Sequence, residues 1–283
     1  MRFFRTLFAL PARFFAKRKR PTKTSDETIY LSQLESLSKE EWDAILAKDP
    51  AEAARWIYAA ATYGHVDAQL HWAQMLLDGI GMDRDPEAAF RWFSIAARSK
   101  RADAMNMLGR CHELGWGTPV DFGKAAEHYR EAAAKASDWA RFNLGCLLLE
   151  GKGIARAPDE AFRLFMSAVE QGHVKSLNMV GRCYQNGWGC TQNIAEAAQW
   201  FRRSAEAGDF RGQYSHAQVL IEQGKLDEAL SWLRLAIDQS HVELCREMAK
   251  VLSEHPEPRL REMATYADAR AVKLAGAGHP VEQ

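Results

Sequence analysis

The chain has 283 residues, of which 47% are apolar and 26% charged, a composition that supports a buried core and excludes a chain disordered throughout. Its net charge is zero, yet residues 1–25 hold eight basic side chains and no acid, which leaves 29 basic against 37 acidic side chains, or −8, for the rest. Such an acidic body argues against a general nucleic-acid binder, and five cysteines in a chain this long do not make a disulfide framework.

The first twenty residues alternate basic side chains with Phe and Leu and end in the basic run 17–20. Their apolar stretch is interrupted by Pro11 and Arg13, lacks a small-x-small cleavage site, and is far short of the ~20 apolar residues of a spanning helix. Three interpretations stay open: a disordered leader, a segment lying on an anionic membrane surface, and a targeting signal. We expect residues 1–27 to be a disordered leader and linker. We expect a cytoplasmic location, with peripheral contact at the inner face of a membrane as an option, in preference to secretion.

Residues 28–64 predict an N-terminal helical cap. The stretch Ser38-Lys39-Glu40-Glu41 has the pattern of a capping box, in which a serine and a glutamate satisfy each other's backbone amides. Asp49-Pro50 then marks the start of another helix, because proline at the first helical position loses no needed hydrogen bond. The exposed ends of a stack of helical units need caps of this kind.

A glycine pair recurs every thirty-six residues, as Gly79-x-Gly81, Gly115-x-Gly117, Gly151-x-Gly153 and Gly187-x-Gly189. A fixed interval indicates stacked supersecondary units. In each unit an apolar stretch precedes the glycines and an Ala- and aromatic-rich stretch follows, which predicts a helical hairpin of helix A and helix B. The units, called repeats 1 to 4 below, are residues 65–100, 101–136, 137–172 and 173–208.

The repeats share small, aromatic and glycine positions. The glycines are expected where helix A turns back into helix B, because only glycine takes positive φ there without a steric cost. A small residue recurs on helix A, and it lets two helices approach closely: Ala73, Gly109, Gly145, Gly181. An aromatic recurs on helix B, where we expect it to fill the gaps between neighbouring hairpins: Phe93, Tyr129, Phe165, Phe201.

This pattern resembles the Sel-one-like repeat (SLR), a relative of the tetratricopeptide repeat. Repeat 2 matches it at Ala104, Leu108, Gly109, Gly115, Gly117, Lys124, Ala125, Tyr129, Ala132 and Ala133. Repeat 4 matches it at Ser176, Gly181, Tyr184, Gly187, Gly189, Ala197, Trp200 and Ala205. The resemblance covers residues 65–208, and weaker copies extend it to about 51–276. It implies an all-α fold, a right-handed α/α superhelix (solenoid) of stacked hairpins, in a family of adaptors and protein-binding scaffolds.

The repeat shortens after Gly208. Residues 209–240 form a unit of thirty-two residues whose glycine pair is reduced to Gly224. We expect degenerate repeats and a C-terminal cap over residues 209–276, and a tail over 277–283 that frays.

Sequence motifs for catalysis are absent. His65, His173 and His241 open equivalent A helices, in a position filled by arginine in repeat 2, so a turn or cap role is favoured over a metal site. The glycine pairs lack the Gly-Lys-Ser/Thr ending of a phosphate loop. We therefore expect no enzyme, no cofactor and no metal, although an enzyme that uses the Cys and His residues stays as a weaker hypothesis. A disulfide between Cys183 and Cys190 also stays open.

The outward side of the A helices is the candidate binding surface. Helical geometry turns positions 70, 71, 74 and 78 and their equivalents outward, onto the face that is concave in such superhelices. The side chains chosen there as partner contacts are Asn106, Arg110, Phe142, Asn178, Arg182 and Tyr214. Aromatics, arginines and amides suit a protein or peptide segment. The alternative is that Phe142 and Tyr214 pack between repeats and that the arginines are merely solvated.

Two tryptophans lie inside glycine turns, Trp116 in repeat 2 and Trp188 in repeat 4. A tryptophan between two glycines is hard to bury, and exposed apolar surface often marks a contact. These rings either meet a partner or fold back on the stack. We therefore expect a noncatalytic scaffold that binds a protein or peptide, and no nucleic acid. The alternative is a membrane-surface assembly or regulatory factor recruited through residues 1–20.

Overall fold

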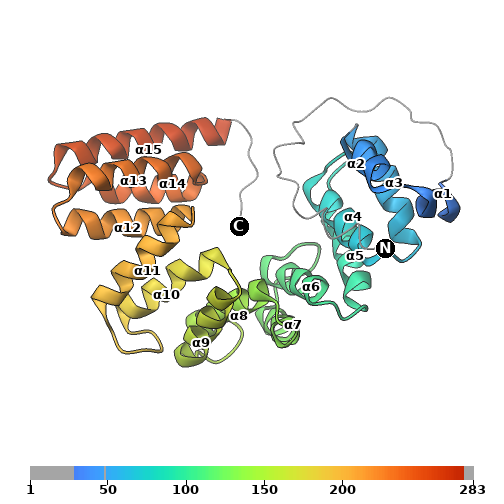
Figure 1. Ribbon diagram of the computed structural model, residues 1–283, viewed down its shortest axis with the longest axis horizontal. Coiled ribbons are helices and arrows are strands. Elements are labelled where there is room, and N and C mark those ends of the chain that lie inside the picture. Colours follow the sequence, from blue (N-terminus) through green and yellow to red (C-terminus); the bar gives the residue numbers. More distant parts are fainter. Residues whose placement is uncertain (1–28, 48, 277–283) are drawn as a thin grey trace. The chain divides into compact units, whose positions relative to one another are not determined.

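The computed structural model describes residues 29–47 and 49–276, and all regular elements in this part of the chain are helices (Figure 1). The first seven are α1 (Leu31–Ser36), α2 (Lys39–Ala47), α3 (Pro50–Thr62), α4 (Val66–Asp78), α5 (Pro86–Ala97), α6 (Ala102–Leu114) and α7 (Phe122–Ala134). The others are α8 (Asp138–Glu150), α9 (Pro158–Glu170), α10 (Val174–Asn186), α11 (Ile194–Glu206), α12 (Phe210–Glu222), α13 (Leu226–Gln239), α14 (Val242–Ser253) and α15 (Pro258–Gly276). The predicted all-α class is confirmed.

The chain divides into two compact units, at residue 137. In the first unit, α3 to α7 pack each on the next, and α2 packs on α3. In the second unit, α9 to α12 pack in the same sequential way, α8 packs on α9, and α14 and α15 close the stack as a last hairpin. The A helices of the repeats are α4, α6, α8 and α10, and α12 continues their series. Sequential packing of hairpins is the construction of an α-solenoid, as the repeat interval predicts.

The first glycine of each pair ends helix A in the left-handed conformation, with φ of 69° at Gly79 and 70° at Gly115. The second glycine has positive φ and also a close neighbour. A Cβ on Gly117 would lie 2.0 Å from the carbonyl oxygen of Pro86, and one on Gly189 would lie 2.1 Å from that of Pro158. These two turns therefore rest on the first residue of the preceding B helix, which conformational freedom alone does not predict.

The small positions on the A helices contact the aromatic rings of their own hairpins. A Cβ on Gly109 would lie 2.6 Å from Tyr129, and one on Gly181 would lie 2.6 Å from Phe201. The ring on helix B therefore fills the groove left by glycine on helix A of the same hairpin. The sequence predicts the ring in the gaps between neighbouring hairpins, and this contact within one hairpin was not predicted. These rings are among the most buried side chains in the protein.

Several predicted caps form. The Ser38 amide donates to the Glu41 carboxylate at 2.8 Å, and the Glu41 amide donates to the Ser38 hydroxyl at 3.2 Å, which confirms the capping box. The B helices α5, α7 and α11 begin after an Asp or Asn whose side chain accepts a hydrogen bond from a backbone amide.

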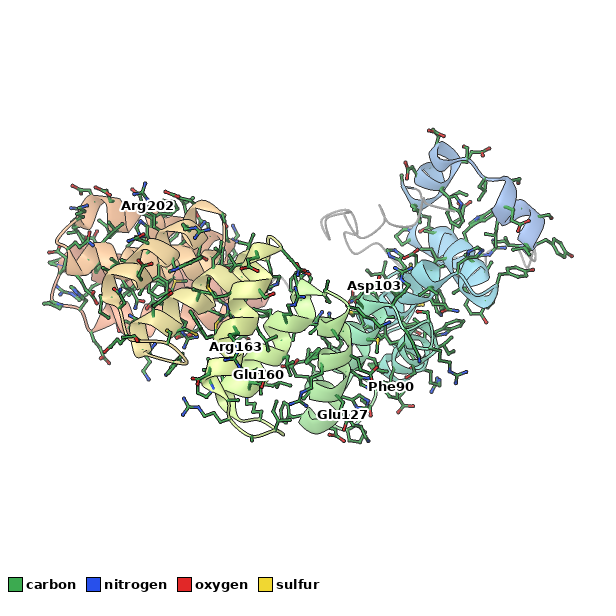
Figure 2. The ribbon with its side chains drawn as sticks, turned by 60° about the horizontal axis from the view of Figure 1, so that its bottom comes forward. Phe90, Asp103, Glu127, Glu160, Arg163 and Arg202 are labelled. Carbon is green, nitrogen blue, oxygen red and sulfur yellow. The ribbon has the colours of Figure 1, made fainter. Side chains whose placement is uncertain are left out.

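Charged side chains elsewhere on the B helices, such as Glu127, Arg163 and Arg202, are exposed (Figure 2).

Residues 1–28 and 277–283 lie outside the described residues, and with them the expectations of a leader and a fraying tail. Among the helices that the structure does describe, none combines the length and apolar character needed to cross a membrane. Cys183 and Cys190 are both free thiols.

Candidate protein-binding surface

One stripe of every A helix stays out of the core. It consists of positions 67, 71, 74 and 78 and their equivalents, which lie within an arc of about 60° at 100° per residue. We call it the A-helix face, and none of its side chains is buried: Asp67, His71, Gln74, Asp78 (α4); Asp103, Met107, Arg110, Leu114 (α6); Trp139, Asn143, Cys146, Glu150 (α8); Lys175, Met179, Arg182, Asn186 (α10); Arg211, Ser215, Gln218, Glu222 (α12).

The first position of the stripe predicted from the sequence, that of Leu70, is not part of this face. Leu70, Asn106 and Asn178 are only 1%, 8% and 5% exposed, so the expectation that they point outward is wrong. The position lies about 70° from the centre of the stripe, on the side of the adjacent A helix. There the Asn178 Oδ1 atom accepts a 3.0 Å hydrogen bond from the Ser215 hydroxyl of α12. The asparagine joins two A helices.

Phe142 and Tyr214 occupy the same position and are half-buried. The Phe142 ring centroid lies 4.8 Å from that of His173 and 6.1 Å from that of Phe165. Tyr214 packs against the apolar cluster of the C-terminal helices, and burial raises the pKa of its phenol to about 12. Both rings pack between helices, as the alternative interpretation has it.

The arginines predicted from the sequence do lie on the A-helix face, and each is paired with a tryptophan. The guanidinium carbon of Arg110 is 4.6 Å from the centroid of Trp116, and that of Arg182 is 5.4 Å from the centroid of Trp188. The tryptophan amides donate to the carbonyl oxygens of Cys111 and Cys183, which places each ring back over its own helix A. All four side chains remain partly exposed. The glycine turns of repeats 2 and 4 thus each present a guanidinium stacked on a tryptophan ring.

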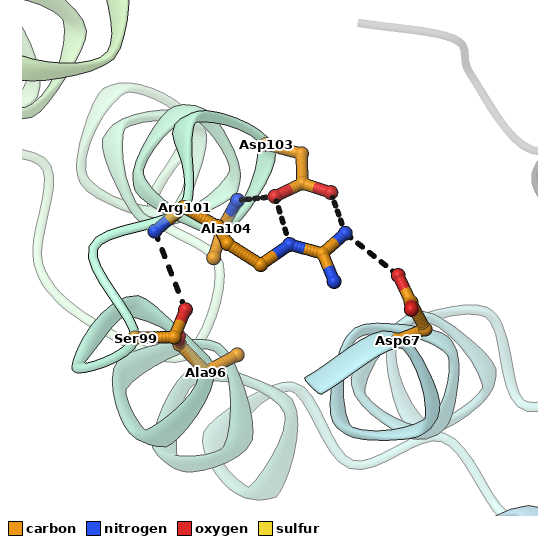
Figure 3. A network of polar contacts seen from close by, with 6 residues as sticks. All are labelled: Asp67, Ala96, Ser99, Arg101, Asp103 and Ala104. Carbon is orange, nitrogen blue, oxygen red and sulfur yellow. Dashed lines mark hydrogen bonds and ion pairs between the residues drawn. The ribbon is translucent and has the colours of Figure 1, made fainter. Parts of the chain in front are cut away.

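The N-terminal end of the face differs between the two compact units. In the first unit, Arg101 is bonded to two aspartates of the face, at 2.6 Å to Asp67 of α4 and at 3.1 Å to Asp103 of α6 (Figure 3). These hydrogen bonds raise the pKa of the Arg101 guanidinium well above its usual value. The arginine joins neighbouring A helices, and its single positive charge is shared by two carboxylates, so this end of the face stays acidic.

In the second unit, the equivalent positions hold Trp139, Lys175 and Arg211. The Trp139 side chain is 47% exposed, and the Lys175 ammonium lies 5.2 Å from its ring centroid. His173 lies edge-on to Trp139 with centroids 4.6 Å apart, and burial lowers its pKa from 6.5 to about 4. Here the end of the face is cationic and aromatic.

A histidine cluster in the first unit was not predicted. The rings of His112 and His128 stack with centroids 5.6 Å apart, and Phe90 meets His112 edge-on at 5.5 Å (Phe90 is labelled in Figure 2). Phe162 and Tyr184 repeat the second contact at 5.4 Å in the second unit. Phe90 and Phe162 are separated by twice the repeat length, and so are His112 and Tyr184. This interval is the sequence signal that could have indicated the recurring ring contact. No group of three metal-ligating side chains occurs among the described residues.

Comparison with known proteins agrees with the repeat pattern. The family model described as Sel1 repeat matches residues 43–65, 66–100, 102–137, 140–173, 174–209 and 218–241. The chain is similar to a crystal structure of a Sel1 repeat protein from Oxalobacter formigenes, with 23% identity, 83% of this chain and 98% of that chain covered, and a TM-score of 0.69. It is also similar to the structure of a protective antigen of uropathogenic Escherichia coli strains that displays an SLR fold, with 24% identity, 87% and 55% covered, and a TM-score of 0.60.

A curated relative is the chitin synthase regulator SKT5 of Saccharomyces cerevisiae, which is 27% identical over 168 residues. The match covers 56% of this chain and only 24% of that protein's length. The chain therefore matches about a quarter of that regulator's length. The six matched segments span most of the described helices, from α2 to α13. The chain belongs to the Sel1 repeat family.

Proposed function

We propose that this protein is a noncatalytic scaffold that binds a protein or peptide segment on its A-helix face. Sel1 and tetratricopeptide-like repeats are typical of protein interaction modules, and the curated relative is named as a regulator of another protein. The observation that carries the proposal is the A-helix face itself. Four positions of each A helix stay unburied through successive repeats, while the intervening positions are used for packing.

Arg110 and Arg182 are the proposed polar contacts. A guanidinium can bind a carboxylate or a main-chain carbonyl through its planar fork. Stacking on Trp116 and Trp188 restrains each arginine before a partner arrives, which reduces the entropy lost on binding. Trp116 and Trp188 would themselves supply apolar contact area beside the cation.

The other residues predicted from the sequence as partner contacts lie below the A-helix face, among the packed helices. Asn106 and Asn178 are buried, and Phe142 and Tyr214 are half-buried. We infer that they contribute to binding by holding neighbouring A helices in register, as the Asn178 to Ser215 hydrogen bond does.

The thiols argue for a noncatalytic role. Burial raises the pKa of Cys111 and of Cys183 to about 12, and it raises the pKa of Cys190 and of Cys245 as well. A thiol is a weak nucleophile until it loses its proton, so these four would be poor nucleophiles at neutral pH.

The test compares two pairs of arginines. Arg110→Ala with Arg182→Ala should abolish capture of the crosslinked partner in a pull-down read by mass spectrometry. The control is Arg130→Ala with Arg163→Ala, which removes one exposed arginine from a B helix of each compact unit. Thermal unfolding of both variants should stay close to that of the parent protein. Equal loss of the partner in both pairs, or no loss in the first, would contradict the proposal.

Recruitment to a membrane surface through residues 1–20 stays a prediction, because that segment lies outside the described residues. Its basic and aromatic composition favours binding to anionic lipid. Flotation of the full chain with phosphatidylserine vesicles, with and without residues 1–20, tests it. Failure of the full chain to float at low salt would rule it out.

A further inference from the structure

We propose that the A-helix face of the second compact unit binds an extended, acidic protein segment, whose carboxylates lie against Lys175, Arg182 and Arg211. This inference rests on the proposed function and adds the chemistry of the partner. Lys175 and Arg182 are on α10 and Arg211 is on α12, and these two helices contact each other directly. All three side chains are exposed.

Two of these cations are placed against the preference of their helices. Lys175 and Arg211 are each the second residue of a helix, where the positive end of the helix dipole disfavours a cation and favours an acid. Asp67 and Asp103 occupy this position in the first unit, in agreement with the rule. A local rule broken without a compensating contact is expected at functional sites.

In the described part of the chain neither cation forms an ion pair with a carboxylate, and each lies over an aromatic ring instead, Lys175 over Trp139 and Arg211 over Phe210. Other cations of the second unit are paired with carboxylates, among them Lys152 with Glu150 and Arg259 with Asp227. No ion pair is formed there by Lys175, Arg182 or Arg211. Arg211 comes within 3.4 Å of a ring nitrogen of His241. The nearby Asp209 carboxylate interacts with Arg211 electrostatically, but its hydrogen bonds are with the Ser204 hydroxyl and the Gly212 amide. The positive charge of this surface is therefore available to a partner.

An apolar contact lies beside the cations. Trp139 is half-exposed although it is among the largest side chains of the unit. His173 supports it from one side, and Lys175 lies over its ring. Tryptophan next to basic groups is typical of the residues that dominate protein interfaces. A free polypeptide with both acidic and apolar side chains would satisfy the two features together.

The spacing of the cations suits an extended chain. Lys175 and Arg182 are seven residues apart on one helix, which is about 10 Å along its axis. Lys175 and Arg211 lie on adjacent helices, whose axes are typically 8–10 Å apart. A chain in the polyproline II conformation rises about 3.1 Å per residue and has three residues per turn, so acidic residues at every third position lie on one side, about 9 Å apart, and match the separation of neighbouring cations.

A nucleic acid or an anionic lipid surface fits less well. Glu222 of α12 stands at the other end of the same face and is exposed. Its carboxylate would repel a continuous row of phosphates. A short acidic segment can end before it reaches Glu222.

The experiment measures binding of a fluorescein-labelled peptide, with Glu at every third position and Leu and Ala between, to the full-length chain by anisotropy. Replacement of Glu by Gln in the peptide should remove binding. The variant Lys175→Ala, Arg182→Ala, Arg211→Ala should raise the Kd by about tenfold or more, since each exposed ion pair accounts for a few-fold. The variant Lys225→Ala, Arg246→Ala, Lys250→Ala removes the same charge from exposed positions elsewhere in the unit and should change the Kd by less than about twofold.

The outcomes separate this inference from the proposed function. Equal binding of the Gln peptide, or equal weakening in both triple variants, overturns the acidic-segment proposal. So does binding of polyuridylate or phosphatidylserine vesicles through the three cations in the absence of peptide binding. If the acidic peptide does not bind but the crosslinked partner is still lost with Arg110→Ala and Arg182→Ala, the scaffold function stands while this inference fails. Trp139→Ala should also weaken binding of the peptide, without lowering the melting temperature of the protein by more than a few degrees.

Discussion

Gly117 rests directly on Pro86: a Cβ on the glycine would lie 2.0 Å from the proline carbonyl oxygen, and its φ is 68°. Two repeats are joined here through their backbones. The turn that ends one helix A is seated on the start of the preceding helix B, and the contact recurs between Gly189 and Pro158.

Gly117→Ala should therefore destabilise the protein by more than positive φ alone explains. Gly64→Ala is the matched control, because Gly64 has φ of 90° and no atom within 4 Å of the added methyl group. We expect Gly64→Ala to cost about 1–2 kcal/mol, the usual penalty of the left-handed conformation. Gly117→Ala should exceed it by at least a further ~1 kcal/mol from overlap with the backbone. Urea unfolding of both variants measures the difference, and equal values would show that the turn moves away freely.

Lys175→Glu should make the protein more stable. The substitution places an acid at the start of α10, where the helix dipole favours it by about 0.3–1 kcal/mol. Lys250→Glu is the control with opposite sign, since Lys250 is in the last turn of α14 and its cation is well placed. Thermal unfolding at low salt should show the first variant stabilised and the second destabilised. The same substitution should weaken binding of the acidic peptide. A Lys175→Glu variant that is more stable and also binds the peptide more tightly would contradict the proposed role of Lys175.

His173 should make stability depend on pH. Burial lowers its pKa from 6.5 to about 4. Between pH 4 and pH 6.5 the imidazole is therefore protonated in the unfolded chain and neutral in the folded chain. Its contribution to stability is complete above pH 6.5 and is lost progressively as the pH falls towards 4. His173→Gln should be less stable than the parent at pH 7, and the gap should narrow at pH 5. Denaturant midpoints at the two pH values provide the measurement, and a constant gap would mean that His173 does not titrate in this range.

The thiols should differ in reactivity. Cys111 and Cys183 are buried and their pKa values are raised to about 12, whereas Cys190 is partly exposed, although burial raises its pKa as well. A colourless aromatic disulfide reagent at pH 8 should modify Cys190 well before the other two. Mass spectrometry of digested protein identifies the modified residue. Rapid modification of Cys183 in the folded protein would show that the fourth repeat opens locally.

The repeat interval was sufficient to predict the hairpins, because identical spacing forces equivalent residues into equivalent packing. Gly109 and Tyr129 were recognised as a small and a large position, but the interval does not say that they meet inside one hairpin. The family resemblance and the hairpin packing agree on the α-solenoid, which the matched segments confirm.

The binding surface was predicted less completely. Positions 70 and 71 are only 100° apart on a helix, and the sequence cannot tell which of them faces the adjacent A helix. The choice of Asn106 and Asn178 as outward residues was wrong for that reason, while Arg110 and Arg182 do lie on the A-helix face. Their pairing with Trp116 and Trp188 depends on side-chain torsions that no spacing encodes. The Arg101 bridge could have been found, since Asp67 and Asp103 occupy one position in adjacent repeats.

The seating of the Gly117 and Gly189 turns on the preceding helices also bears on how such a protein can change over time. Because main-chain contacts and buried side chains join the repeats, the unburied side chains of the A-helix face are not needed to hold the stack together. They can be exchanged one by one while the stack persists, as the aspartates of the first unit and the basic residues of the second illustrate. New binding preferences can therefore arise by single substitutions, without redesign of the framework that displays them.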